Sequence, residues 1–118
     1  MRHLRILEAG KVEMEIVETL IFTKQILGML SDEEYKELQW ALVANPFTGE
    51  VIPGSNGLRK IRWAGKGSGK RGGLRIIYYC LTKEAKIYLI FAYRKSEQED
   101  LTKAQLKMLS DYVKKGVL

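Results

Sequence analysis

Residues 58–64 read LRKIRWA, residues 74–81 read LRIIYYCL and residues 86–93 read KIYLIFAY. The first stretch alternates charged with bulky residues, and the other two are rich in β-branched and aromatic residues, which is typical of β-strands. Only residues 82–85 separate the second stretch from the third, a distance short enough for a β-hairpin. The sequence therefore predicts three successive strands, the last two of which form a hairpin.

Two helices are predicted upstream of these strands. Apolar residues recur at helical spacing over 21–30, where Gly28 can weaken or end the helix. Ser31 and Glu34 then have the spacing of a capping box at the start of a second helix. The Asn-Pro pair at 45–46 should end that second helix.

A loop, a third helix and an N-terminal strand complete the predicted order. Residues 46–57 are rich in Pro, Gly, Ser and Asn and are expected to form a loop, whereas 12–16 alternate as a strand does. Thr102 and Gln105 have the spacing of another capping box, which predicts the start of a third helix, and Gly116 is a signal for the end of that helix. The order strand, two helices, three strands, helix predicts an α+β fold. We expect a small, mostly antiparallel sheet with two N-terminal helices and a C-terminal helix.

The composition restricts the class of protein. The chain has 118 residues, the size of one domain, and its net charge of +6 favours polyanionic partners. Cys80 is the only cysteine, so no disulfide can form within the chain. No apolar stretch approaches the roughly 20 residues that span a bilayer, so we expect a cytoplasmic protein with no membrane partner. With His3 as the only histidine, neither a two-histidine ribonuclease nor a metal site is expected.

Positive charge is concentrated in residues 51–83, a window without any Asp or Glu. Acidic residues gather instead in 31–37 and 97–100. This separation of charge favours a phosphate backbone as the partner of the basic segment. The cations of the window are Arg59, Lys60, Arg62, Lys66, Lys70, Arg71, Arg75 and Lys83.

Strand geometry predicts which of these cations converge. Lys60 and Arg62 are two residues apart and project from one face of their strand, whereas Ile61 and Trp63 project from the other. Arg75 begins the next strand, opposite the first if the connecting loop closes a hairpin. We therefore expect three cations on one patch, an array that binds phosphates.

The connecting loop reads GKGSGKRGG over 65–73 and contains a G-x-G-x-x-G match from Gly67 to Gly72. A dinucleotide-binding fold needs a helix after this motif, whereas a strand is predicted here, and Arg71 stands where a Walker A motif needs Ser or Thr. We expect a flexible, cationic hairpin tip that follows a phosphate backbone. Its Lys66, Lys70 and Arg71, together with Arg59, are the residues predicted to bind that backbone, which is RNA by the resemblance given below.

The combination of motifs resembles the RelE/ParE toxin superfamily, and most closely its HigB-like branch, over roughly residues 14–113. The motifs are SDEEY at 31–35, NP at 45–46, VIPG at 51–54, GLRKIR at 57–62, the glycine and lysine-rich loop, GLRIIYY at 73–79 and YRK at 93–95. By this resemblance 14–118 is the toxin domain and 1–13 an extension, or Met14 is the true start.

The resemblance implies a RelE-like, microbial-RNase-like fold and the toxin of a type II toxin-antitoxin system. Such a toxin enters the A site of the 30S ribosomal subunit and cuts mRNA, because the 2′-hydroxyl attacks the adjacent phosphate. It needs no metal and no cofactor. Its partners would be the ribosome, mRNA and a HigA-like helix-turn-helix antitoxin, through which alone it would meet operator DNA.

The resemblance also implies roles for individual residues. Lys60 and Arg62 would hold phosphate and stabilise the charge of the phosphorane, and Arg75 would clamp the scissile phosphate. Lys95, with Arg94 as the alternative, would lie by the leaving oxygen.

The general base stays open at this point. Some relatives use a tyrosine near the C-terminal helix, where this chain has Leu101. Tyr93 and a lysine whose pKa is lowered by other cations are the candidates. Two other functions also stay open: a ParE-like gyrase inhibitor without nuclease activity, and an inactive nucleic-acid-binding relic.

Overall fold

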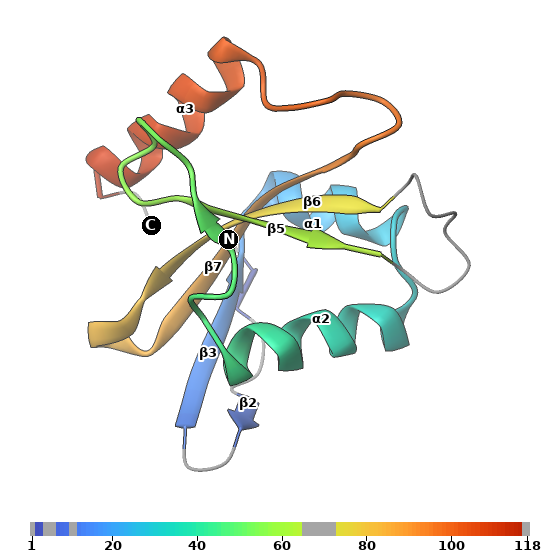
Figure 1. Cartoon of the computed structure of the whole chain (residues 1–118). Helices are drawn as coiled ribbons and strands as arrows, with labels where there is room; N and C mark the ends of the chain where they lie inside the picture. Colours follow the sequence, from blue (N-terminus) through green and yellow to red (C-terminus); the bar gives the residue numbers. More distant parts are fainter. Residues whose placement is uncertain (1, 4–6, 10–11, 65–72, 117–118) are drawn as a thin grey trace.

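The computed structural model describes residues 2–3, 7–9, 12–64 and 73–116, which form an α+β structure with three α-helices and a mixed sheet (Figure 1). In chain order the elements are β1 (Arg2–His3), β2 (Leu7–Ala9), β3 (Val12–Glu18), α1 (Leu20–Leu27), α2 (Asp32–Ala44), β4 (Glu50–Val51), β5 (Arg59–Trp63), β6 (Leu74–Leu81), the 3-10 turn η1 (Thr82–Glu84), β7 (Lys86–Arg94) and α3 (Lys103–Lys114).

The sheet has the strand order β1-β3-β7-β6-β5-β4, and β2 pairs with β3 outside this order. It is mixed because β3 runs parallel to β7, whereas the other strand pairs are antiparallel. The predicted hairpin is confirmed, with Leu81 opposite Lys86, and β5 lies along the other side of β6. Relative to the predicted bounds, β7 runs one residue further, to Arg94, and β5 is one residue shorter at each end.

Three short strands were not predicted. β1 and β2 pair with β3 in a segment where the sequence shows no pattern, and β4 pairs with β5 inside the segment predicted to be a loop. Strands of two or three residues carry too few positions for an alternating pattern to be visible. Their backbone is extended because a partner strand lies alongside.

The predicted helix ends are confirmed. α1 ends at Leu27, immediately before Gly28. Both capping boxes are present, one between Ser31 and Glu34 and the other between Thr102 and Gln105. None of the described helices has the length and apolar character that crossing a lipid bilayer requires.

The sheet carries a hydrophobic core on each face, and α2 and α3 lie on opposite sides of the strands (Figure 1). Ile61 and Trp63 of β5 pack against the core that contains α1 and α2. Lys60 and Arg62 alternate with them and therefore project from the opposite face, on which Leu109 of α3 is buried. We call these the α1/α2 face, with buried residues Ile16, Phe22, Ile26, Leu38, Leu42, Ile76, Tyr78 and Leu89, and the α3 face, with buried residues Val17, Leu58, Ile77, Tyr88, Ile90, Tyr93 and Leu109.

Side-chain hydrogen bonds fix the chain between α2 and β5. The buried hydroxyl of Tyr78 accepts from the backbone N–H of Gly49 at 2.9 Å and donates to the carbonyl of Pro46 at 2.8 Å. The guanidinium of Arg59 donates to the carbonyls of Phe47 and Gly49, at 3.2 and 2.7 Å. The entry to β5 is thereby fastened to β6.

The second half of this segment is tied to α3. Asn56 has a positive φ of 62°, and its side-chain amide donates to the hydroxyl of Ser110 at 2.8 Å and to the Ser110 carbonyl at 3.2 Å. The position of β5 is therefore set from both of its neighbours, β6 and α3.

Removing one hydroxyl tests this anchoring. Tyr78→Phe leaves the Gly49 N–H and the Pro46 carbonyl without their buried partner, and should lower the free energy of unfolding by about 1–3 kcal/mol. Urea denaturation measures the loss. Tyr112→Phe, on the half-buried side of α3, is the matched control and should change stability by less than about 0.5 kcal/mol. Equal losses in the two variants would contradict the anchoring role.

Candidate active site

Three site residues form one row across the sheet. Arg62 of β5 pairs with Arg75 of β6, and Arg75 pairs in turn with Tyr93 of β7. Directly paired residues on neighbouring strands project from the same face, with their Cβ atoms about 4.5–5.5 Å apart. Tyr93 is buried in the core of the α3 face, which identifies the face for all three. The predicted convergence of Arg62 with Arg75 therefore agrees with the observed register.

Lys60 joins this row from two residues away on β5. It projects from the same face as Arg62, because side chains alternate along a strand. Its ammonium lies 3.4 Å from a carboxylate oxygen of Asp100. Within the part of the chain that the structure describes, by contrast, no carboxylate is paired with Arg62 or Arg75. These two guanidinium groups therefore retain hydrogen-bonding capacity for an anion.

Asp100 contacts two of the predicted site residues and was not singled out by the sequence analysis. Its Oδ1 accepts from the backbone N–H of Leu101 at 2.8 Å, and from the Lys60 ammonium and the Tyr93 hydroxyl at 3.4 Å each. The Leu101 N–H, followed by the charge of Lys60, holds the pKa of Asp100 below its ordinary value. The side chain is therefore a carboxylate at neutral pH. The only sequence signal for it was the acidic cluster at 97–100, which gives no contact partner.

Tyr93 is held in its protonated form. Burial, followed by the charge of Asp100 and the hydrogen bond to it, raises the pKa of Tyr93 to about 12, although the charge of Arg75 acts in the opposite direction. A hydroxyl with this pKa keeps its proton at neutral pH, and can donate a hydrogen bond or a proton to an oxyanion. At neutral pH Tyr93 therefore carries its proton, and its hydroxyl donates to Asp100.

The structure separates Lys95 from its alternative, Arg94. Arg94 pairs with Leu74 on the α1/α2 face, and its guanidinium donates to the carbonyl of Gly28, at the end of α1, at 2.7 Å. Lys95 follows β7, and its backbone N–H donates to the Gly73 carbonyl, next to the start of β6. Its ammonium is 3.6 Å from the carboxylate of Glu99. Lys95 therefore lies at the end of the sheet where β6 begins, and Arg75 is the second residue of β6.

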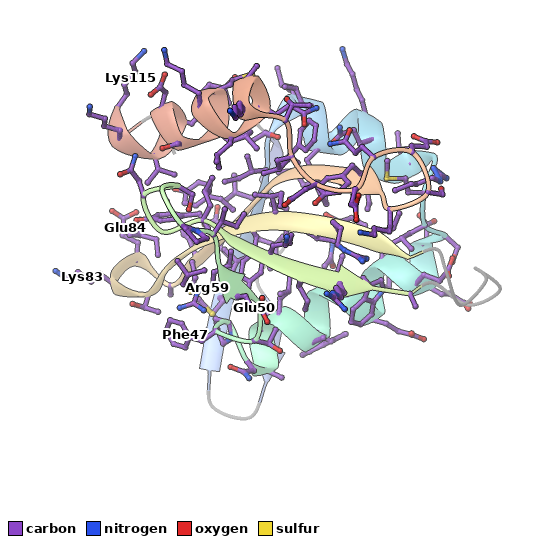
Figure 2. The ribbon with its side chains drawn as sticks, turned by 45° about the horizontal axis from the view of Figure 1, so that its top comes forward. Phe47, Glu50, Arg59, Lys83, Glu84 and Lys115 are labelled. Carbon is purple, nitrogen blue, oxygen red and sulfur yellow. The ribbon has the colours of Figure 1, made fainter. Side chains whose placement is uncertain are left out.

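Arg59 also belongs to the other face. It pairs with Tyr78, which is buried on the α1/α2 face, and its guanidinium carbon lies 5.1 Å from the centroid of the Phe47 ring (Figure 2). Its hydrogen bonds to the segment between α2 and β5 give it a structural role. Among the other predicted RNA-binding residues, Lys66, Lys70 and Arg71 lie outside the described residues, as does most of the glycine and lysine-rich loop.

No protein-family model matches this chain. The described residues contain no group of three or more His, Cys, Asp and Glu side chains placed to hold a metal ion. What the site does has therefore to be argued from its own geometry, since a fold alone does not determine a function. That geometry is a row of two arginines and a protonated tyrosine, flanked by a lysine and a carboxylate.

The titration of Tyr93 gives a direct test of this environment. Because its pKa is about 12 in the folded protein and 10.0 ordinarily, the unfolded chain loses this proton first as the pH rises. Stability that is fully present below pH 10 should therefore fall between pH 10 and about 12, and fall less in Tyr93→Phe. Urea denaturation of both proteins across this range measures the difference. Parallel pH profiles would show that Tyr93 is not in the environment described.

Proposed function

We propose that the protein is a RelE/HigB-type toxin, a ribosome-dependent endoribonuclease that cuts mRNA in the A site by metal-independent attack of a 2′-hydroxyl. The observation that carries this proposal is the single row of Arg62, Arg75 and Tyr93, with Lys60 beside it on the same face. A row that mixes two strong cations with a protonated hydroxyl has the chemistry to bind a phosphodiester and to protonate an oxygen next to it.

The reaction places demands that these side chains meet. As the 2′-oxygen attacks phosphorus, its proton passes to a base, for which a lysine is the other candidate from the sequence, the bond to the 5′-oxygen breaks, and that leaving oxygen takes up a proton. Negative charge builds on the non-bridging oxygens during this step, and fixed cations stabilise that charge more than they stabilise the starting phosphodiester. Lys60 and Arg62 hold these oxygens, and Arg75, at the centre of the row, clamps the scissile phosphate. Lys95 lies at the edge near the leaving 5′-oxygen. DNA lacks the 2′-hydroxyl and cannot react.

We also propose a family for the fold, bounds for the domain, and partners for the protein. Two helices, α1 and α2, are packed on one face of the sheet, so the row lies on the opposite face beside α3, an arrangement that we interpret as RelE-like and similar to the microbial ribonucleases. We assign the toxin domain to 14–118 and propose that 1–13 extend it, since β1, β2 and the first two residues of β3 lie in this segment and β1 and β2 pair with β3. The protein would act in the cytoplasm on mRNA bound to the 30S subunit. A HigA-like helix-turn-helix antitoxin would neutralise it and connect it to operator DNA.

Primer extension on mRNA bound to purified ribosomes tests the proposal. The wild-type protein should produce cuts at codons in the A site. Arg75→Ala should reduce cutting by at least about 100-fold, as the loss of one well-placed electrostatic contact does. It should remain folded, because Arg75 is only half-buried and supplies no core volume. Lys83→Ala also removes one positive charge, but from the exposed hairpin turn at the far end of β6 (Figure 2), and should cut as the wild type does.

The same assay separates the competing functions. Undiminished cutting by a folded Arg75→Ala protein would contradict the assigned site. Inhibition of DNA supercoiling by gyrase without any mRNA cut would support the ParE-like function instead. If the wild-type protein shows neither activity, a nucleic-acid-binding relic is the remaining interpretation.

A further inference from the structure

The connection between β7 and α3 brings an acidic residue into the cationic row. This connection runs back along the sheet on the side of α3 (Figure 1). At its end, the Asp100 carboxylate contacts Lys60 on β5 and Tyr93 on β7, two strands that are separated by β6. The carboxylate therefore spans β6, the strand from which Arg75 projects. Through Oδ1 alone, Asp100 thus contacts both outer strands of the site.

We propose that Asp100 is a positioning residue, whose carboxylate fixes the Lys60 ammonium and the Tyr93 hydroxyl at one point above β6, so that both face the phosphate held by Arg62 and Arg75. This inference rests on the proposed nuclease function, and it identifies what orients the site's two flanking donors. Neither the resemblance nor the residue pattern assigns a role to Asp100.

The negative charge of Asp100 is consistent with positioning and not with substrate affinity. A carboxylate next to a phosphate site repels the phosphate, so its presence weakens binding of the substrate backbone. A residue that only served affinity would not be acidic here. What the carboxylate does supply is order, because lysine has a long flexible stem that loses considerable rotamer entropy when it is fixed. The Lys60 ammonium donates one of its three N–H groups to Asp100, and the other two remain for phosphate oxygens.

Several hydrogen bonds hold the backbone around Asp100 in place. The Leu101 N–H donates to its carboxylate, and Thr102 next to it is the N-cap of α3. The side chain of Gln98 donates both to the Asp100 carbonyl, at 3.0 Å, and to the Gln105 side chain of the capping box, at 2.9 Å. Asp100 is thereby fastened to the start of a helix that is itself packed on the sheet. A positioning group needs such support, because a small displacement of catalytic groups has a large effect on rate.

Asp100→Asn, with Glu97→Gln as its matched control, tests the proposal. Glu97 lies in the same acidic connection and is exposed. Two quantities are measured for each variant: the single-turnover rate of cutting ribosome-bound mRNA, and the affinity for an RNA oligonucleotide with a 2′-deoxy substitution at the scissile position. Asp100→Asn should cut about 10–100-fold more slowly while binding this RNA at least as tightly as the wild type. Asp100→Glu should recover part of the rate, and Glu97→Gln should change neither quantity.

An unchanged rate in Asp100→Asn would overturn the proposal. Binding that weakens as much as the rate would also overturn it, because the residue would then serve affinity. A second readout does not depend on RNA: the pKa of Tyr93, measured by NMR with ¹³C-labelled tyrosine, should fall in Asp100→Asn because a raising charge is removed. If the wild type cuts nothing but this pKa falls, the proposed function fails while the placement of Asp100 is supported. An unchanged Tyr93 pKa overturns the placement itself.

Discussion

The backbone register of β5, β6 and β7 is the constraint on which the site depends. Arg62, Arg75 and Tyr93 meet only because each is the direct partner of the next across two antiparallel ladders. A slip of one residue in either ladder would turn the slipped strand's side chains to the opposite face and break the row. The register is set by burial on both faces of the sheet, since Ile61 and Trp63 of β5 pack on the α1/α2 face, whereas Ile77 of β6 and Tyr93 of β7 are buried on the α3 face. The same apolar contacts that stabilise the fold thus place the charges.

Gathering cations on one face has a cost that the surrounding structure offsets. Neighbouring positive charges repel, and the repulsion is stronger where the site is partly shielded from water. The acidic connection between β7 and α3 reduces this repulsion, because Asp100 lies beside Lys60 and Glu99 beside Lys95. The two arginines keep no such counter-ion among the described residues. In the function that we propose, this division leaves the guanidinium groups for the substrate phosphate and keeps the lysines ordered at its flanks.

Local patterns predicted most of the elements, and pairings between distant segments account for what they missed. The capping boxes at Ser31 and Thr102, the hairpin of β6 and β7, and the shared face of Lys60 and Arg62 all follow from residues within a few positions of one another. The parallel pairing of β3 with β7 joins segments about 70 residues apart, and no local pattern reports it. The contact of Asp100 with Lys60 also joins residues far apart in the sequence, so no local pattern indicated it. The choice between Lys95 and Arg94 likewise needed the register of β7, which places Arg94 on the α1/α2 face.

In the function that we propose, the α3 face, and not the α1/α2 face, binds an RNA phosphate. Side-chain NMR of the arginine Nε–H groups, recorded while an uncleavable RNA oligonucleotide is added, tests it most directly. We expect the signals of Arg62 and Arg75 to shift together as the RNA binds. Those of Arg59 and Arg94, whose guanidinium groups donate to backbone carbonyls on the other face, should stay in place. Shifts confined to Arg59 and Arg94, with Arg62 and Arg75 unmoved, would contradict it.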